Sequence, residues 1–216
     1  IDVSHPSKES MRDMIRLSKA PIIASHSSCR ALCNHSRNLD DEQLEWMKEN
    51  GGVVQTVAFG AYVNTEKNNK FREATRAILE EVAASKGFEI KSWSEVRKWE
   101  KEARDDYWNT YSSIRNEAKT RYPEVYDIAE PVGVKDFVDH IDYMVKKIGL
   151  EHVGISSDFD GGGGVHGWND ASETLNVTIE LVKRGYTEEE IALLWGGNLF
   201  RVLDEVQRIA QEIQQS

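Results

Sequence analysis

Four short β-type runs alternate with helical segments along the chain, and this alternation constrains the fold more than any other feature. The runs cover residues 1–5, 21–25, 53–57 and 153–157. Strands that alternate with helices are typical of parallel βαβ units, so we expect an α/β fold. A closed (β/α)8 barrel needs eight strands. These four strands therefore form either an open sheet or one part of a barrel.

Helical periodicity and capping residues predict the segments between the strands. Helices are expected from about Lys8 to Lys19, from Leu39–Glu42 to Gly51, from Val134 to Ile148, from Ser172 to Lys183, and from Thr187 to Ile213. The charged stretch 66–121 carries three tryptophans and reads as a helical insertion. We expect residues 1–216 to form a single catalytic-domain segment that includes this insertion.

Charge and hydropathy narrow the possible partners. The chain has 37 acidic and 27 basic side chains and a formal net charge of -10, which disfavours binding to a nucleic acid. No run approaches the roughly 18 apolar residues of a membrane span, and the first residues lack the pattern of a signal peptide. We expect a soluble chain of unknown compartment, with bacterial cytoplasm and periplasm both possible.

Three of the four expected strands end on side chains that can do chemistry. His5 and His26 follow β-type runs, and Asp158 follows the last one. Because the carboxyl ends of parallel strands share one edge, two imidazoles there could converge on one Zn²⁺. Either histidine alone could simply be a polar residue that ends a strand and bonds the loop. Taken together on successive strands, they favour metal ligation.

Asp158 could accept a proton from a metal-activated water and then deliver it to a leaving amine. Its neighbour Asp160 could instead be the working group. Alternatively, both aspartates could cap the turn at 161–164, which is rich in glycine.

Arg37 lies in the loop after the second strand, where a guanidinium could bind a substrate carboxylate through two hydrogen bonds. A solvated loop arginine is the alternative. Cys29, Cys33 and His35 resemble part of a zinc site, but the chain has no second cysteine pair to complete it. The two cysteines, four apart in an expected short helix, are more naturally a buried thiol pair than a disulfide.

The remaining histidines read as structural. His140 lies within a helix, and His152 precedes its strand at the end opposite to the site. Only His166, which follows the glycine loop, could approach an active site.

Six ordered motifs resemble the membrane (renal) dipeptidase family, the zinc metallodipeptidases of the amidohydrolase-like barrel group. The motifs are Ile1–His5, Ser25–Ser28, Arg37–Asn38, Gly51–Val54, His152–Gly161 and Gly196–Val202. They span nearly the whole chain, and Gly167–Asp170 after the glycine loop is most similar to the bacterial branch.

The resemblance implies a TIM-type (β/α)8 barrel of the metal-dependent hydrolase kind, with this chain as its C-terminal half. It implies two zinc ions, one of them held by His5 and His26. Arg37 would bind the carboxylate of a dipeptide. Asp158 would move the proton between a metal-bridging hydroxide, which attacks the peptide carbonyl, and the departing amine.

The resemblance also sets limits. The family's His-x-Asp pair, bridging glutamate and substrate-binding histidine have no counterpart in the chain, so we expect them upstream, in a missing N-terminal half. We expect the fragment alone to be inactive, and the complete enzyme to be a homodimer. The alternatives are another amidohydrolase, acting on N-acyl amino acids or lactones, and a non-catalytic barrel module.

Overall fold

The computed structural model describes residues 1–124 and 129–215 of the chain, which divide into two compact units. Unit 1 comprises Ile1–Glu66 and Val132–Ser216, and unit 2 comprises Lys67–Pro131. Unit 1 is built from strands alternating with helices, as expected for the α/β class. That the whole chain acts as one catalytic-domain segment stays a prediction.

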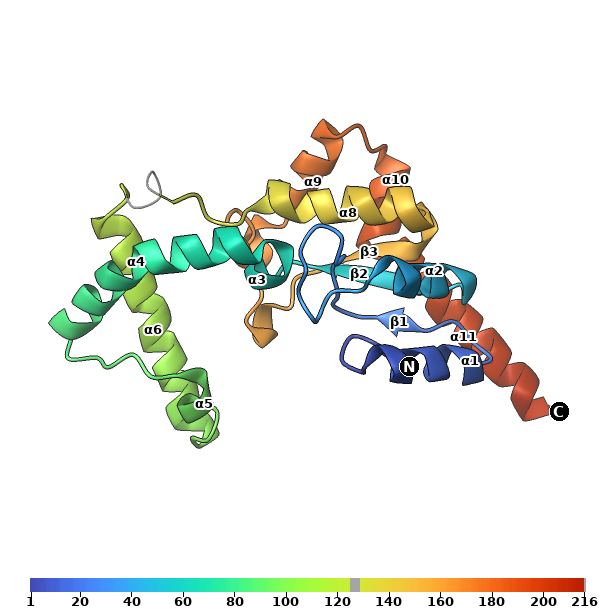
Figure 1. Cartoon of the computed structure of the whole chain (residues 1–216), viewed down its shortest axis with the longest axis horizontal. Helices are drawn as coiled ribbons and strands as arrows, with labels where there is room; N and C mark the ends of the chain where they lie inside the picture. Colours follow the sequence, from blue (N-terminus) through green and yellow to red (C-terminus); the bar gives the residue numbers. More distant parts are fainter. Residues whose placement is uncertain (125–128, 216) are drawn as a thin grey trace. The chain divides into compact units, whose positions relative to one another are not determined.

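Unit 1 contains a parallel sheet of three strands in the order β1-β2-β3. These strands are β1 (Ile23–Ala24), β2 (Val53–Val57) and β3 (Val153–Ser156) (Figure 1). Ile23 pairs with Val53, and Val54 pairs with Val153. The carboxyl ends of all three strands therefore lie at one edge of the sheet. A three-stranded sheet is open, so a barrel is not seen in the described residues.

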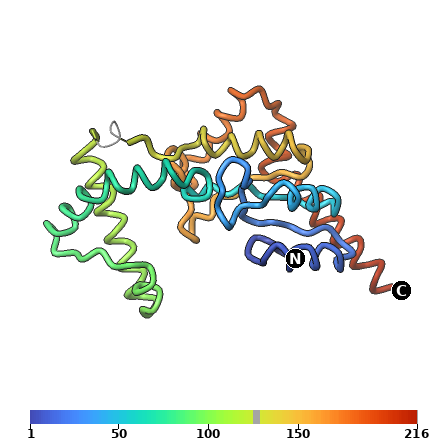
Figure 2. Tube along the Cα trace, viewed as in Figure 1, coloured from blue at the N-terminus to red at the C-terminus, as the bar shows by residue number. Residues whose placement is uncertain are grey.

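The expected strand at residues 1–5 is reduced to one bridge between Asp2 and Ile23. The first residues run beside β1 (Figure 2), where the Val3 amide donates to the Ile23 carbonyl at 2.8 Å. The amide of Ser4 then donates to Oδ1 of Asp2 at 3.0 Å. This local bond turns the backbone out of the ladder and ends the extended segment.

Side chains also limit β1, which covers two of the five residues expected at 21–25. The Ile22 amide donates to Oδ1 of Asn50 at 2.8 Å, and the Ser25 amide donates to Oδ1 of Asp2 at 3.0 Å. The amides at both ends of β1 are thus satisfied by side chains instead of a neighbouring strand.

The helices of unit 1 follow the expected order. They are α1 (Lys8–Leu17), α2 (Asp41–Glu49), α3 (Gly60–Val63), α8 (Val134–Ile148), α9 (Leu175–Lys183), α10 (Glu188–Ala192) and α11 (Asn198–Gln215). Short 3-10 turns lie at Leu150–His152, Phe159–Gly161 and Ala171–Glu173. The expected start at Ser172 was therefore early, because a 3-10 turn precedes α9. A π-helical turn at Leu193–Gly197 separates α10 from α11, which were expected as one helix.

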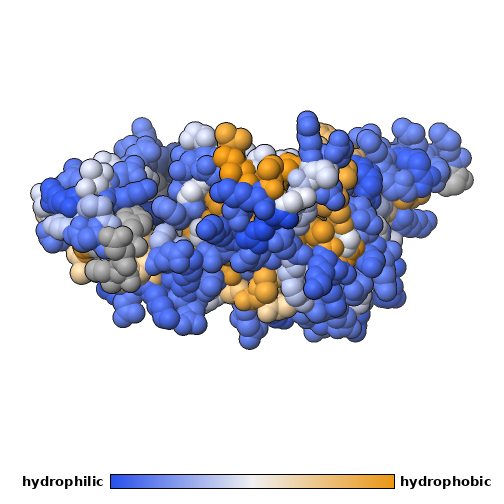
Figure 3. Space-filling view, turned by 90° about the horizontal axis from the view of Figure 1, so that it is seen from above, coloured by the Kyte–Doolittle hydropathy of each residue, from blue (hydrophilic) through white to orange (hydrophobic). Residues whose placement is uncertain are grey.

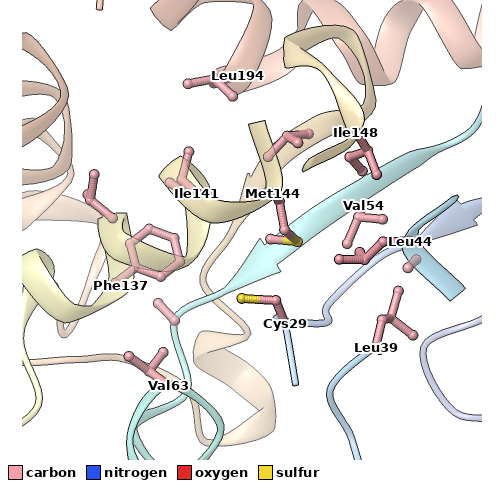
Figure 4. Close-up of a cluster of buried hydrophobic side chains, with 14 of the residues drawn as sticks. Cys29, Leu39, Leu44, Val54, Val63, Phe137, Ile141, Met144, Ile148 and Leu194 are labelled. Atoms are coloured by element: carbon pink, nitrogen blue, oxygen red, sulfur yellow. The ribbon is translucent and has the colours of Figure 1, made fainter. Parts of the chain in front are cut away.

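The core of unit 1 lies between the sheet and helix α8. One face of α8 presents four fully buried side chains, Phe137, Ile141, Met144 and Ile148 (Figure 4). Their spacing of four, three and four residues keeps them on one side of the helix. They pack in the same cluster as Val54 of β2. Burying each such side chain contributes about 1.5–3 kcal/mol.

A buried histidine ties α8 to two loops. Nε2 of His140 donates to the Val63 carbonyl at 2.9 Å, and its Nδ1 accepts from the Cys29 amide at 3.2 Å. Burial lowers the pKa of His140, which keeps the ring neutral in this role. His152 is also buried, with Nδ1 2.8 Å from the Gly52 carbonyl. The structural interpretation of both histidines is confirmed.

The two cysteines are free and buried, as expected, but they do not lie on a helix. Cys29 forms an isolated parallel bridge with Leu39, which closes the loop between them. Sγ of Cys29 lies 3.1 Å from Nδ1 of His140. The expectation of a short helix here was wrong because this bridge engages the backbone.

Unit 2 is helical, as expected for the insertion. It contains most of α4 (Thr65–Ser85), together with α5 (Trp93–Val96) and α6 (Lys101–Arg121). A small core of Val82, Ala83, Ile114 and Ala118 joins α4 to α6. The tryptophans of the insertion belong to an aromatic group, in which the ring centroids of Trp93 and Trp108 are 5.7 Å apart. Phe88 joins this group to the small core, because it packs on that core and contacts Tyr107.

Some apolar side chains remain on the surface. Figure 3 shows apolar patches on a mostly hydrophilic face. The exposed apolar residues of the chain include Leu175, Ile179 and Val182 on one side of α9.

Across residues 1–124 and 129–215, no helix combines the length and apolar character needed to cross a membrane.

We predict that Cys29 resists alkylation in the folded protein. Burial raises the pKa of its thiol to about 12, so the thiolate that reacts with iodoacetamide is scarce at about pH 8. Mass spectrometry should find Cys29 unmodified in native buffer and fully modified in guanidinium chloride. Rapid modification in native buffer would contradict the buried position.

We also predict that His140→Ala lowers the free energy of unfolding by roughly 2–4 kcal/mol, because it leaves a cavity and two unpaired backbone groups. Urea denaturation measures the change. The matched control is His166→Ala at an exposed position, for which we expect a change within about 0.5 kcal/mol. Equal effects of the two substitutions would contradict the structural role of His140.

Candidate active site

Two histidines meet at the carboxyl edge of the sheet. His5 follows the bridge of Asp2 to β1, and His26 follows β1 itself. Their Nε2 atoms are 2.8 Å apart, and the ring centroids are 4.8 Å apart. The structure therefore brings together the two imidazoles that the sequence places at successive strand ends.

Hydrogen bonds fix the ring of His26 from behind. Oγ of Ser25 lies 2.7 Å from Nδ1 of His26 and donates to Oδ2 of Asp2 at 2.5 Å. Burial raises the pKa of the Asp2 carboxyl, but the bonds from Ser25 and Ser4 outweigh burial and lower that pKa below its usual value. Asp2 is accordingly a carboxylate at neutral pH.

The surroundings of His5 favour its neutral form. Burial, the Arg37 guanidinium and His26 lower the pKa of His5, and the carboxylates of Asp2 and Asp158 oppose them less strongly. A metal ligand must be a neutral imidazole, because the lone pair of a ring nitrogen binds the ion. The neutral ring of His5, which is the charge state that metal binding would require, therefore prevails at neutral pH.

Arg37 extends from its loop to the histidine pair. Its NH2 donates to the Ser4 carbonyl at 2.9 Å and lies 3.3 Å from Nε2 of His5. The guanidinium carbon lies 5.5 Å from the centroid of the Tyr62 ring, which provides a cation–π contact. The amide of Arg37 donates to Nδ1 of His35 at 3.2 Å. These contacts hold a positive charge beside the two imidazoles.

Asp158 follows β3 in an unusual backbone conformation. Its φ of 52° is in the left-handed region, and among the described non-glycine residues it alone has a positive φ. Its carbonyl accepts from the amides of Gly161 and Gly163 at 3.0 and 2.7 Å. A Cβ on Gly163 would lie 2.1 Å from the Ser157 carbonyl oxygen, so only glycine fits this turn. Strain of this kind is often retained at functional sites.

The side chains of the two aspartates in this loop differ in position. Asp158 is half-buried and close enough to His5 to affect its pKa, whereas Asp160 is exposed on the 3-10 turn. The side chain of Asp158 forms no capping bond to that turn. Within the described ranges, it also forms no direct hydrogen bond to His5, His26 or Arg37. The carboxylate of Asp158 therefore influences His5 through its charge, without a direct hydrogen bond.

The histidine pair suits a divalent metal ion such as zinc. Two nitrogens on one tetrahedral zinc ion lie about 3.4 Å apart, so the rings would need to separate by only a few tenths of an ångström. Nowhere in the described residues do three or more histidine, cysteine, aspartate or glutamate side chains cluster as a metal site. The described residues thus bring together two imidazoles at this edge, without a third side chain of these kinds.

The alternative zinc fragment does not assemble. Sγ of Cys29 faces His140, whereas Sγ of Cys33 lies 3.2 Å from Oγ1 of Thr65. The ring of His35 instead lies tilted against Tyr62, with a centroid distance of 4.5 Å. His166 lies in the bridge to Gly133.

Sequence reasoning missed Asp2, Ser25 and Tyr62. A signal was available for the first two, because each lies just before an expected ligand: Asp2 three residues before His5, and Ser25 directly before His26. Tyr62 lies on α3, 25 residues after Arg37, and no local pattern links the two.

Known proteins resemble this chain in sequence and in fold. The family profile described as "Membrane dipeptidase (Peptidase family M19)" matches residues 1–216. Among curated proteins, dipeptidase aclJ of Aspergillus oryzae is 28% identical over 99% of the chain, and dipeptidase ataJ of Aspergillus terreus is 30% identical over 97%. The chain covers 36% and 37% of those two proteins.

Two solved structures give the same picture of the fold. The probable dipeptidase PvdM from Pseudomonas aeruginosa is similar over 96% of this chain and 50% of its own, with a TM-score of 0.66 and 39% identity. A metallo peptidase from Rhodobacter sphaeroides, liganded with a phosphinate mimic of L-Ala-D-Ala, has a TM-score of 0.62 at 21% identity over 94% of this chain. At this identity the likeness concerns the fold alone, and it extends over 41% of the Rhodobacter protein. With its α/β fold and a family match along its whole length, the chain belongs to the membrane dipeptidase family of metallopeptidases.

Proposed function

We propose that this chain supplies one part of the active site of a zinc-dependent dipeptidase. The observation that carries the proposal is the convergence of Nε2 of His5 and Nε2 of His26, 2.8 Å apart, beside Arg37. The chain spans about half the length of PvdM and less of its curated relatives. We infer that the remaining ligands come from protein outside this chain, in the other half of a TIM-type barrel.

His5 and His26 would hold one of two zinc ions. Imidazole nitrogen is a preferred ligand of zinc, and the lowered pKa of His5 favours the neutral ring that such binding requires. When bound, such an ion polarises a carbonyl group and makes water a better nucleophile. The histidines themselves contribute position, since their backbones are held at the end of β1.

Arg37 would bind the free carboxylate of a dipeptide. Its guanidinium is pinned to the Ser4 carbonyl and the Tyr62 ring, so it is oriented before a substrate arrives. The planar guanidinium would select a planar carboxylate through two parallel bonds.

Asp158 would move the proton during hydrolysis. A half-buried carboxylate near the histidine pair can take a proton from the attacking water and return it to the leaving amine. The turn through Gly161 and Gly163 fixes its backbone, which supports a positional role. Asp160, which is exposed, is the weaker candidate.

A dipeptide is the substrate that the family favours, because aclJ and ataJ are named dipeptidases. The phosphinate mimic bound by the Rhodobacter protein represents L-Ala-D-Ala. An N-acyl amino acid also carries a carboxylate that Arg37 could bind, so it forms the natural comparison. The homodimer stays a prediction based on family resemblance.

We predict that this chain binds Zn²⁺ weakly through the histidine pair, and that His5→Ala and His26→Ala each weaken binding roughly 10-fold or more. Isothermal titration calorimetry on the chain measures the affinity. His166→Ala is the matched control and should bind as the unsubstituted chain does. Unchanged binding after His26→Ala would remove the basis of the proposed metal site.

In a complete protein that contains this chain, we predict that Asp158→Asn lowers kcat for L-Ala-D-Ala by roughly 100-fold to 10,000-fold, because a proton carrier is lost. The control Asp160→Asn should leave kcat within about twofold.

In the same complete protein, Arg37→Ala should mainly raise KM for the dipeptide, because the guanidinium would bind the substrate carboxylate. Hydrolysis of N-acetylalanine but not of dipeptides would show that the protein is another kind of amidohydrolase. If neither substrate is hydrolysed, the non-catalytic barrel module is favoured.

A further inference from the structure

Two hydrogen bonds connect the carboxylate of Asp2, through the hydroxyl of Ser25, to Nδ1 of His26, on the side of the ring opposite to the proposed metal-binding atom. We propose that Asp2 is a positioning residue, which acts through Ser25 to hold His26 with its hydrogen on Nδ1 and a free lone pair on Nε2. The inference rests on the proposed function, since it concerns the ligand that His26 would provide.

The tautomer follows from counting hydrogens. The Asp2 carboxylate can only accept, and Oδ2 lies 2.5 Å from Oγ of Ser25, so the single hydroxyl hydrogen of Ser25 goes to Asp2. Oγ of Ser25 is then an acceptor toward Nδ1 of His26, 2.7 Å away. His26 must therefore donate from Nδ1, which leaves Nε2 without a hydrogen.

The opposite arrangement fails on the same contacts. If Ser25 donated to Nδ1 of His26, no hydrogen would remain between Ser25 and Asp2. Two oxygens 2.5 Å apart, one of them a carboxylate oxygen, would then face each other without a proton. That repulsion makes the first arrangement the stable one.

The carboxylate is held too firmly to turn away. Oδ1 of Asp2 accepts from the Ser4 amide, the Ser4 hydroxyl and the Ser25 amide, at 3.0, 2.9 and 3.0 Å. The hydroxyl of Ser4 in turn accepts from the His26 amide at 2.9 Å. One side chain thus orients both the backbone and the ring of His26.

The front of the ring agrees with this assignment. With its lone pair free, Nε2 of His26 accepts a hydrogen from Nε2 of His5 at 2.8 Å. Nε2 of His5 is free to be the donor, because the NH2 group of Arg37 beside it already donates to the Ser4 carbonyl. The lone pair of His26 therefore points at the place that a metal ion would occupy between the two rings.

The test uses three serine variants of this chain. Ser25→Ala removes the hydroxyl that links Asp2 to the ring, whereas Ser25→Thr keeps a hydroxyl there. Ser27→Ala is the matched control, because the Ser27 hydroxyl is buried without a hydrogen-bond partner. Protein fingerprint spectra verify that each variant is folded.

Nitrogen-15 NMR of the imidazole rings, on metal-free protein, reads the tautomer directly. We expect His26 to be the Nδ1–H form in the unsubstituted chain, in Ser27→Ala and in Ser25→Thr. Ser25→Ala should shift His26 toward the Nε2–H form. An Nε2–H tautomer in the unsubstituted chain, or no shift in Ser25→Ala, would overturn the proposal.

Zinc titration of the same variants adds a second readout. We expect Ser25→Ala to weaken binding by roughly 10-fold to 100-fold, as is typical when a group behind a metal ligand is lost. Ser25→Thr should restore affinity, and Ser27→Ala should not change it. Equal affinity in Ser25→Ala and the unsubstituted chain would contradict a positioning role.

The two proposals fail differently. If His26→Ala leaves zinc affinity unchanged, the proposed metal site fails, while the tautomer is still measured by NMR. If His26→Ala weakens binding but Ser25→Ala changes neither tautomer nor affinity, only the positioning role of Asp2 fails.

Discussion

The parallel pairing of β2 with both β1 and β3 is the constraint on which the rest of unit 1 depends. Parallel strands end at the same edge, so the segments that follow β1 and β3 must emerge together. This places His26 and the Asp158 turn on one side of the sheet, although 132 positions separate them in sequence. The bridge of Asp2 to Ile23 adds His5 to the same edge. The grouping of these side chains is therefore a consequence of strand direction before it is a property of any single side chain.

A hydrogen bond from the Cys29 amide to His140 connects the apolar core to the loop that follows His26. Helix α8 buries its apolar face against β2, and His140 on that helix bonds the Cys29 amide three residues beyond His26. A neutral ring suits this position, because burial lowers the pKa of His140 more than the carboxylates of Asp136 and Asp139 raise it. The loop that carries Arg37 closes on itself through the bridge of Cys29 to Leu39. Packing of the core thus limits how far the loop, and with it the guanidinium, can move.

Sequence patterns predicted the long elements well and the short ones poorly. Helix α8 has the expected bounds because Gly133 and Gly149 flank a strongly amphipathic run. The strand at 1–5 was overestimated, because a bond from the Ser4 amide to Asp2 is invisible in hydropathy. The proximity of His5, His26 and Arg37 was predictable from strand order. The contact of Arg37 with Tyr62 was not, since it depends on how two loops fold over each other.

The helical insertion leaves and re-enters unit 1 between two elements that touch. Helix α3 precedes it and α8 follows it, and Nε2 of His140 on α8 donates to the carbonyl of Val63 on α3. A hydrogen bond within unit 1 thus joins the segment before the insertion to the helix after it. Its 65 residues, Lys67–Pro131, carry their own small core. A change in the length of this segment would therefore leave the packing behind the sheet edge of unit 1 in place.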